Sequence, residues 1–317
     1  MFINVIWLIA FVILAGLSIR FFVKLVRSSR LPVRFGGGFG VGLLSALLVL
    51  ISVLGLLGII FTYSPRGNPV VEVQVAGTAE QIERGQQIAN WTCTGCHSVD
   101  KNLPLSGGED IMADIPMPIG AATPANLTPA GRISEWSDGE LQRAIREGTS
   151  PDGSLLTVMS ANTFRYLSQE DLDAVVAYLR SQPAIETDIE QKNSLTFLSM
   201  VMQPIGMLPV KSPPDFGPPP HVDPAATSEY GEYATKVFDC ALCHGDDFSG
   251  GAGGIVPAGP SLAGAKVWTT EQFINTMRTG ETPYGTILSD KMPWEEIGKM
   301  DDQTLEAVLL YLKDAAP

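Results

Sequence analysis

The stretch WTCTGCHSVD (residues 91–100) places two cysteines three positions apart, with a histidine directly after the second. FDCALCHGDD (residues 238–247) repeats that arrangement, so all four cysteines of the 317-residue chain lie in the two copies. Both copies match Cys-x-x-Cys-His, the attachment pattern for a c-type haem, because two thiols at this spacing reach the vinyl groups of one porphyrin while the adjoining imidazole binds its iron. The sequence therefore predicts two covalently attached haem c groups. Their protein ligands are Cys93, Cys96 and His97, and Cys240, Cys243 and His244.

Other sites also use a Cys-x-x-Cys pair. A redox dithiol usually lies in a thioredoxin-like βαβ context, and a zinc finger needs four convergent ligands. A structural disulfide is the third alternative. None of these explains why a histidine follows directly in both copies, so we favour haem attachment.

Composition divides the chain into two unlike parts. Residues 1–68 contain six basic residues and no acidic one, so the rest carries 15 Lys and Arg against 34 Asp and Glu, a net charge of −19. The first part holds two apolar runs, residues 2–19 or 2–26 and residues 39–61. Roughly 20 apolar residues cross the hydrocarbon of a bilayer as a helix. We therefore predict two membrane spans followed by an acidic body in water.

The basic residues indicate how this hairpin is oriented. They cluster between the two runs, in residues 20–34, so the positive-inside tendency places that loop in the cytoplasm and residues 64–317 on the outer, periplasmic side of the inner membrane. A secretory signal is the alternative for the first run, but no basic residue precedes it. Neither run contains His, Asp or Glu, which excludes a haem held by histidines inside the spans. Gly55 and Gly58 would let another helix approach closely.

Two stretches downstream of the cysteine motifs align without a gap. MSANTFRYLSQEDLDAVVAYLRS starts at Met159 and MPWEEIGKMDDQTLEAVLLYLKD starts at Met292. Of the ten methionines, only these two occupy matched positions before the closing helix, so we predict that they are the sixth iron ligands. Thioether ligation opposite histidine raises a haem's potential and suits electron transfer. Met300 aligns with Leu167 and is expected in the core.

The same two halves carry matched helix signals. Each closing helix has apolar residues at i, i+3, i+4 and i+7, and capping boxes and C-terminal glycines mark other helix ends. The apolar positions are Leu172, Val175, Val176 and Leu179 in the first half, and Leu305, Val308, Leu309 and Leu312 in the second. The capping boxes are Thr78/Gln81, Ser137/Glu140 and Thr269/Gln272. The glycines are Gly148 and Gly280.

The two halves resemble class I cytochrome c domains, and residues 79–183 are similar to the domains of multihaem cytochrome subunits of periplasmic alcohol and sugar dehydrogenases. The likeness rests on CTGCH, PANLTPAGRISEWSDGELQRAIREG and LSQEDLDAVVAYLRS. In that family a proline-containing stretch after the haem motif supplies a backbone carbonyl to the haem histidine, which implies roles for Pro124 and Pro260. The family usually has Met-Pro at the ligand, whereas Ser160 follows Met159, so Met117-Pro118 remains an alternative ligand.

Residues 184–226 separate the two halves. The apolar, methionine-rich part, residues 193–209, is too short and too interrupted by proline to span a bilayer, so we expect it to pack on a haem domain or a partner. Residues 213–226 are proline-dense and should form a semi-rigid spacer. His221 lies there as the one histidine outside the haem motifs; we expect a solvated side chain, with iron ligation as the alternative.

These observations predict an all-α protein: a transmembrane hairpin (1–68), a first cytochrome c domain (69–183), a linker (184–226) and a second cytochrome c domain (227–317). We expect such a protein to relay single electrons outside the membrane as a subunit of a respiratory or photosynthetic complex (a quinol-oxidising complex, a terminal oxidase or a dehydrogenase), and not to be an enzyme by itself. We expect membrane redox subunits, a soluble electron carrier and the lipid bilayer as partners, and no nucleic acid. The alternatives are a dihaem peroxidase, a free membrane-anchored shuttle and an assembly scaffold.

Overall fold

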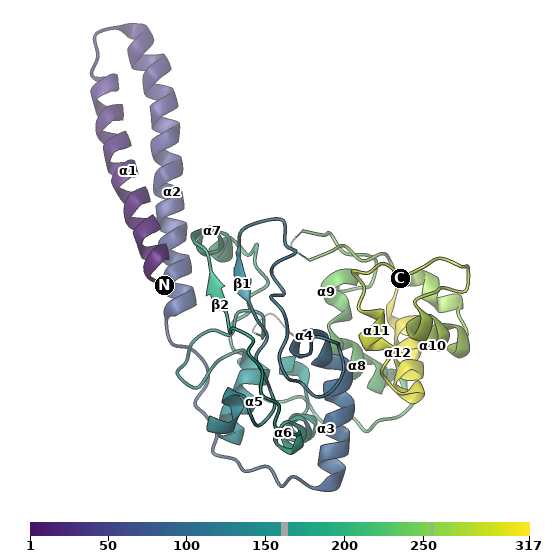
Figure 1. Cartoon of the computed structure of the whole chain (residues 1–317). Coiled ribbons are helices and arrows are strands. Elements are labelled where there is room, and N and C mark those ends of the chain that lie inside the picture. The colour runs from purple at the N-terminus through teal and green to yellow at the C-terminus, as the bar shows by residue number, and fades with distance from the viewer. Residues whose placement is uncertain (160–163, 255) are drawn as a thin grey trace.

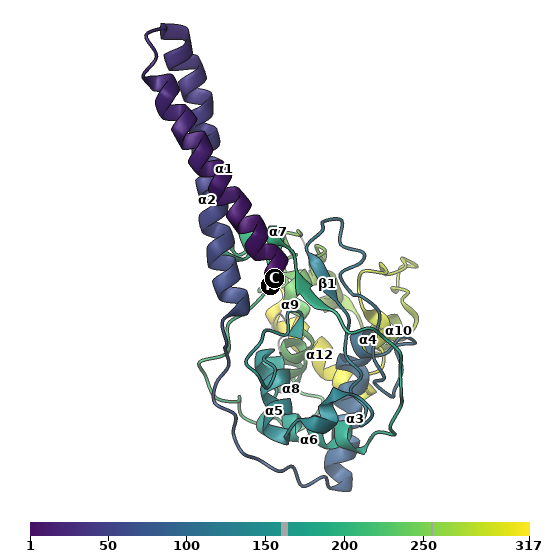
Figure 2. The same cartoon turned by 60° about the vertical axis from the view of Figure 1, so that its left-hand side comes forward.

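The computed structural model describes residues 1–159, 164–254 and 256–317; Ser160, the departure from Met-Pro noted above, lies outside them. Its amino-terminal part is a hairpin of α1 (Phe2–Val26) and α2 (Gly38–Tyr63), joined through the short π-helix η1 (Val33–Gly37). The hairpin projects from a globular body, and the chain's first residue lies where the hairpin meets that body (Figures 1 and 2). Both helices are apolar all round and largely exposed, which confirms two helices long enough to cross a bilayer.

The first helical unit consists of α3 (Ala79–Thr92), α4 (Thr94–His97), α5 (Asp138–Glu147) and α6 (Gln169–Ser181). The predicted capping boxes at Thr78 and Ser137 are present, and Gly148 ends α5 in the left-handed conformation. Among its described residues, the unit also contains the 3₁₀ turns η2 (Arg132–Glu135) and η4 (Phe164–Tyr166). Helices α3 and α6 cross where Gly85 lies against the Ala174 carbonyl; a Cβ on Gly85 would stand 1.8 Å from that oxygen.

The second helical unit repeats this plan with α8 (Ser228–Phe238), α9 (Cys240–His244), α10 (Thr270–Thr279), α11 (Trp294–Ile297) and α12 (Asp302–Ala315), and with the 3₁₀ turn η6 (Ala263–Val267). The capping box at Thr269 and the left-handed Gly280 are as predicted. Helices α8 and α12 cross at Gly231, whose added Cβ would stand 1.9 Å from the Ala307 carbonyl oxygen. The predominantly helical fold with two repeated units is confirmed.

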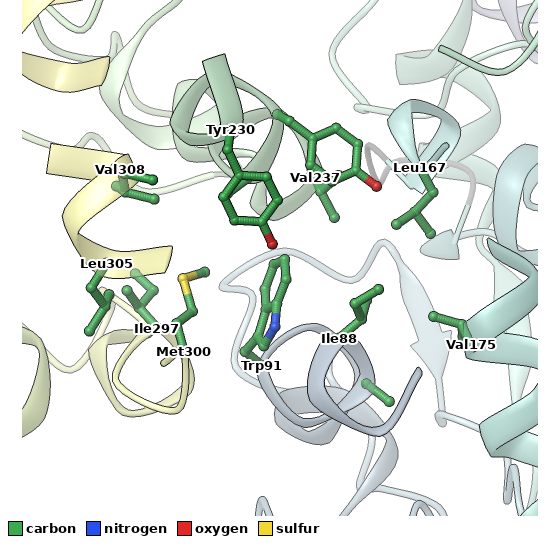
Figure 3. Packing of buried hydrophobic residues seen from close by; sticks show 14 of the residues in the cluster. Ile88, Trp91, Leu167, Val175, Tyr230, Val237, Ile297, Met300, Leu305 and Val308 are labelled. Carbon is green, nitrogen blue, oxygen red and sulfur yellow. The ribbon is translucent and has the colours of Figure 1, made fainter. Parts of the chain in front are cut away.

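The two units share one hydrophobic core. Figure 3 shows Ile88 and Trp91 of α3 beside Tyr230 and Val237 of α8, with Met300 of the second unit in the same cluster. The predicted core position of Met300 is confirmed, and the Trp91 ring stacks on Phe238 with centroids 6.2 Å apart. Because the apolar faces of both units bury each other, the units form a single body.

A buried polar network crosses the same interface. Arg84 binds Asp171 through two hydrogen bonds of 2.8 Å, and it also donates to the Tyr230 hydroxyl. The Tyr233 hydroxyl donates to Asp171 Oδ2 at 2.6 Å. Burial, followed by the Asp171 carboxylate, raises the pKa of Tyr233, so this hydroxyl stays protonated and remains a donor. The network ties α8 to α3 and α6.

The apolar part of the linker folds onto the hairpin. Strand β2 (Asn193–Leu195) pairs antiparallel with β1 (Gly120–Ala122), and α7 (Phe197–Met202) with the 3₁₀ turn η5 (Gln203–Ile205) follows directly. Phe197 lies against Gly55 and the Met200 carbonyl against Gly58. The expected close approach to these glycines therefore comes from α7 of the same chain. The segment packs on the first helical unit, as expected, and also on α1 and α2.

Candidate haem sites

The first Cys-x-x-Cys-His motif follows directly from the end of α3. Cys93 is the C-cap of α3 and the N-cap of α4, so α4 is a single turn that carries Cys96 and His97. Its geometry is closed by backbone hydrogen bonds from the amides of Cys96 and His97 to the Cys93 carbonyl. This tight turn brings both thiols and the imidazole to one wall of a cavity.

The His97 ring is held by a backbone carbonyl. Its Nδ1 lies 2.7 Å from the carbonyl oxygen of Ala125, which leaves Nε2 for the iron. The resemblance implied a role for Pro124, one residue earlier, whereas the carbonyl beside the His97 ring is that of Ala125. The Pro124 carbonyl instead accepts a hydrogen bond from the Gly108 amide at 3.1 Å, so the loop's register presents the next carbonyl to the histidine. Burial lowers the pKa of His97, which favours the neutral imidazole that binds a metal.

The second motif forms α9, which begins at Cys240 and ends at His244. The Nδ1 of His244 lies 2.7 Å from the Pro260 carbonyl oxygen, the acceptor that the resemblance implied. Asp239, in the left-handed conformation, separates α8 from α9 and turns the chain into the motif. The same arrangement of histidine and loop carbonyl thus occurs in both units.

Paired glycines hold each loop against its motif, and our sequence analysis did not identify them. The amides of Gly107 and Gly250 donate to the carbonyls of His97 and His244, each at 2.9 Å. A Cβ on Gly108 would stand 1.9 Å from the Cys96 carbonyl oxygen, and one on Gly251 would stand 2.0 Å from that of Cys243. The available signal was Ser-Gly-Gly after each motif, at residues 106–108 and 249–251. These glycines let the loop lie directly on the haem motif.

An apolar cavity in the first unit brings the predicted ligands together. Cys93, Cys96, His97 and Met159 all line it, together with Ala125. Other lining residues are mostly apolar, but two cations, Arg132 and Lys192, suit a ligand that carries carboxylates. The residues present therefore fit a haem.

The alternative ligand for this haem lies elsewhere. The Met117 side chain packs in the hydrophobic cluster that joins α7 to the hairpin, and it does not line the cavity that contains His97. His221 is also remote: it lies at the amino-terminal end of α6, with Nδ1 3.3 Å from Ser168 Oγ and Nε2 3.3 Å from Asp223 Oδ1. Neither side chain is placed to bind iron at the described cavity.

A second cavity lies between the two units. Met292 lines it together with Trp294, and the first unit contributes Trp91 and Cys96. The last turn of α8, which leads directly into Cys240, forms another part of the wall. Cys240, Cys243 and His244 do not line this cavity, so the second set of predicted ligands is not gathered around one space as the first set is. What the cavity brings together is one haem-motif cysteine of the first unit and the predicted methionine of the second.

Charged residues close the rim of this interface. Lys101 Nζ lies 3.0 Å from Glu295 Oε2 and 3.4 Å from Glu296 Oε1. Lys299 Nζ donates to Thr94 Oγ1 at 2.8 Å and also to the Lys101 carbonyl. These contacts hold α11 against α4, the helix that carries the first haem motif.

The four thiols lack the electrostatics of a redox dithiol. Burial raises the pKa of Cys93 to about 11 and that of Cys240 to about 12. Burial also raises the pKa of Cys96 and of Cys243. Catalytic Cys-x-x-Cys pairs instead depend on a lowered thiol pKa. The thiols of this chain are therefore not activated for disulfide exchange.

Comparison with known proteins agrees with two repeated haem units. Residues 82–183 match the family model for cytochrome c, and residues 225–312 match that for subunit III of the cbb3-type cytochrome c oxidase. The chain is 27% identical over 275 residues to the cytochrome c subunit of a quinone-dependent alcohol dehydrogenase from Gluconacetobacter polyoxogenes, covering 74% of this chain and 56% of that relative. A diheme cytochrome c-type protein from Cereibacter sphaeroides is 34% identical over 113 residues, covering 34% of this chain and 38% of the relative.

A further relative is one of the subunits of a nicotinate dehydrogenase from Pseudomonas putida, 31% identical over 140 residues, which cover 43% of this chain and 12% of the relative. This chain spans about half the length of the alcohol dehydrogenase subunit that it matches. In the alcohol dehydrogenase and nicotinate dehydrogenase subunits, the similarity therefore covers part of a longer protein.

Proposed function

We propose that this chain, which carries two cytochrome c domains with two sites for covalent haem c, is the membrane-bound cytochrome subunit of a periplasmic dehydrogenase. In this role the chain passes single electrons from the dehydrogenase partner toward the respiratory chain. The observation that carries the proposal is the interface of the two units, where Cys96 and Met292 line one cavity. The relatives, which include subunits of two dehydrogenases, point to the class of partner.

The chain's own residues bind and orient the haems, which when bound take up and release single electrons. We propose residues 69–183 and 227–317 as the two haem domains. In the first, Cys93 and Cys96 would bind the haem covalently, and His97 and Met159 would hold its iron. In the second, Cys240 and Cys243 would bind the haem covalently, and His244 and Met292 would hold its iron. The Ala125 and Pro260 carbonyls fix the tautomer and direction of the two histidines.

The shared core fixes the distance between the two haem sites. Trp91 and Phe238 stack across the interface, and Arg84, Asp171 and Tyr233 hold the helices on either side of it. Outer-sphere electron transfer requires no bond making by the protein, only a fixed approach of the two groups. A rigid two-unit body meets that requirement.

The hairpin places this body at the membrane. Phe2–Val26 and Val33–Tyr63 are long and apolar enough to cross it, and the basic residues between them favour a cytoplasmic turn. We propose that the hairpin spans the cytoplasmic membrane and that the haem domains face the periplasm. The acidic surface would then attract a basic, soluble electron carrier, with an association rate that falls as salt rises.

Native membranes provide the test. They are solubilised in mild detergent, separated on a native gel, stained for haem, and the proteins of the stained band are identified. The proposal predicts a band much larger than the 33.9 kDa chain, containing a dehydrogenase subunit. A band of this chain alone would favour a free membrane-anchored shuttle. A large band whose haem content is unaffected by loss of this chain's cysteines would favour a scaffold.

A further inference from the structure

Residues 197–208 form an apolar element that lies beside the hairpin at the end nearest the globular body (Figures 1 and 2). We propose that this interfacial segment lies in the outer surface of the bilayer and is covered on its free side by lipid. The inference rests on the proposed membrane span of the hairpin. It assigns a second, non-spanning membrane contact to a stretch that the sequence presents as a connector.

Depth along the helices is the first argument. The segment contacts α2 at Gly55 and Gly58, which lie eight and five residues before its outer end at Tyr63. At a rise of about 1.5 Å per residue, these contacts are about 12 and 8 Å inside that end. Helix α2 has 26 residues and a length of about 39 Å, against about 30 Å of hydrocarbon. A centred helix therefore has both contacts within the apolar layer.

Helix α1 gives the same depth independently. The Phe11 ring stacks on Phe197, with centroids 5.3 Å apart and planes at 13°. Phe11 is nine residues inside the start of α1 at Phe2, which corresponds to about 14 Å. Side chains of interfacial elements reach roughly 5–10 Å into the boundary between headgroups and acyl chains. Two helices thus place the segment at the depth of such an element.

The chemistry of the segment suits that location. From Ser194 to Val210 the chain has no charged residue, and Lys192 and Lys211 flank the stretch. Three of its large apolar side chains are substantially exposed: Leu198 by 41%, Ile205 by 55% and Met207 by 52%. Another side of α7 is packed on α1 and α2, whose own apolar side chains are largely exposed, so the segment lies beside the apolar surface of the hairpin. Lipid is the occupant that such a surface fits.

Three hydroxyl groups at the segment are paired within the protein, although the buried Nε2 of Gln203 has no hydrogen-bond partner. The Thr196 hydroxyl donates to the Pro118 carbonyl at 2.6 Å, and the buried Ser199 hydroxyl donates to the Ile119 carbonyl. Thr62 of α2 donates to Gln203 at 2.8 Å. Non-spanning backbone at membrane depth is tolerated only where its polar groups are satisfied by protein or by water in a cavity. The segment meets this condition for these groups.

This location would hold the first haem site at the bilayer surface. The hydrophobic cluster around α7 includes Ile111, Ala122 and Val158. All three also line the cavity that contains His97 and Met159. The interfacial segment is therefore packed directly on the wall of the first haem site, and the membrane contact and the haem site form one rigid unit.

The experiment uses the full-length, haem-loaded chain in phosphatidylcholine vesicles. An apolar, carbene-generating diazirine that partitions into hydrocarbon is photolysed, and the label is mapped on tryptic peptides. Cleavage after Lys192 and Lys211 releases residues 193–211 as one peptide. The matched control is residues 279–291, which contain Tyr284 and Ile287, exposed by 75% and 68% in the second unit. Residues 35–66, which include α2, report on the spanning hairpin.

We expect peptide 193–211 to carry at least about tenfold more label than peptide 279–291, because only the former would reach the acyl chains. Equal labelling of these two peptides, with strong labelling of 35–66, would overturn the inference while leaving the anchor intact. An unlabelled 35–66 peptide would instead refute the membrane span of the proposed function. Label on 193–211 in vesicles but not in native membranes would show that a protein partner covers the segment, which also overturns lipid as its occupant.

A variant extends the test. Ile205→Asp with Met207→Asp introduces two charges on the exposed side, and we expect the label on 193–211 to fall severalfold. Val267→Asp, at an exposed position in the second unit, should leave that label unchanged. If the double variant retained full labelling, its exposed side would not be the lipid-facing side, and the proposal would fail.

Discussion

At the scale of single residues, each haem histidine depends on a partner far from it in sequence. His97 and His244 use the carbonyls of Ala125 and Pro260, and glycine amides bind the histidine carbonyls. The ligand motifs could be predicted from sequence because their chemistry lies within five neighbouring residues. The carbonyl acceptor of the first unit could not, because Gly107 follows His97 by ten positions whereas Gly250 follows His244 by only six, so the loops have no common register.

Replacing Met159 with alanine should open one axial position. Met159 lines the same cavity as His97, whereas Met117 packs elsewhere. We expect the reduced Met159→Ala protein to bind about one equivalent of carbon monoxide per chain, with a lower potential for that haem, because the thioether no longer fills the sixth position. Carbon monoxide titration followed in the visible spectrum measures this.

Met117→Ala is the control and should leave the spectrum and the carbon monoxide affinity of the parent protein unchanged. The opposite outcome, in which Met117→Ala opens the site and Met159→Ala does not, would reassign the ligand. Stoichiometric carbon monoxide binding by the unsubstituted protein would support the peroxidase alternative.

At the scale of helices, capping and periodicity were readable from sequence, but helix crossings were not. The capping boxes at Thr78, Ser137 and Thr269 are local, so their residue types were sufficient. The contacts of Gly85 and Gly231 with a facing carbonyl depend on how two helices meet. The packing of α7 on Gly55 and Gly58 also depends on tertiary structure. The two glycines had indicated only that another helix could approach closely there.

Substituting Gly85 with alanine should destabilise the first unit. The added Cβ would stand 1.8 Å from the Ala174 carbonyl oxygen, and a backbone atom cannot move aside by a change of rotamer. Overpacking of this kind costs about 1–3 kcal/mol, which exceeds the gain of ~1 kcal/mol in helix propensity. Urea unfolding of the detergent-solubilised protein measures the free energy. Gly264→Ala, where an added Cβ meets no atom within 4 Å, is the control and should change it little.

At the scale of the whole molecule, the shared core makes the two haem units one body. Tyr230, Tyr233 and Ala234 of α8 belong to the same buried cluster as Ile88 and Trp91 of α3. The interface also carries the Arg84–Asp171 ion pair, buried on the Asp171 side. The sequence indicated two similar units but not this contact, because the way one unit packs on the other is a tertiary feature that no local pattern records.

Tyr233→Phe tests the coupling between the units. It removes the hydroxyl that donates to Asp171 at 2.6 Å and accepts from the Ser168 amide at 3.2 Å. A hydrogen bond to a charged group contributes about 1.5–3 kcal/mol, so we expect a loss of that order in the free energy of unfolding. The Soret changes of both haems should move together in one transition. Two separated transitions, or an equal loss in the exposed control Tyr284→Phe, would argue against a coupled interface.

The central claim is that the chain holds two covalent haems. The direct measurement is mass spectrometry of the denatured, alkylated and trypsin-digested protein. We expect residues 85–101, which contain Cys93 and Cys96, and residues 237–266, which contain Cys240 and Cys243, each to carry one haem and no alkylated thiol. Recovery of either peptide with two alkylated cysteines and no haem, from protein made in a host that attaches haem c, would contradict the account.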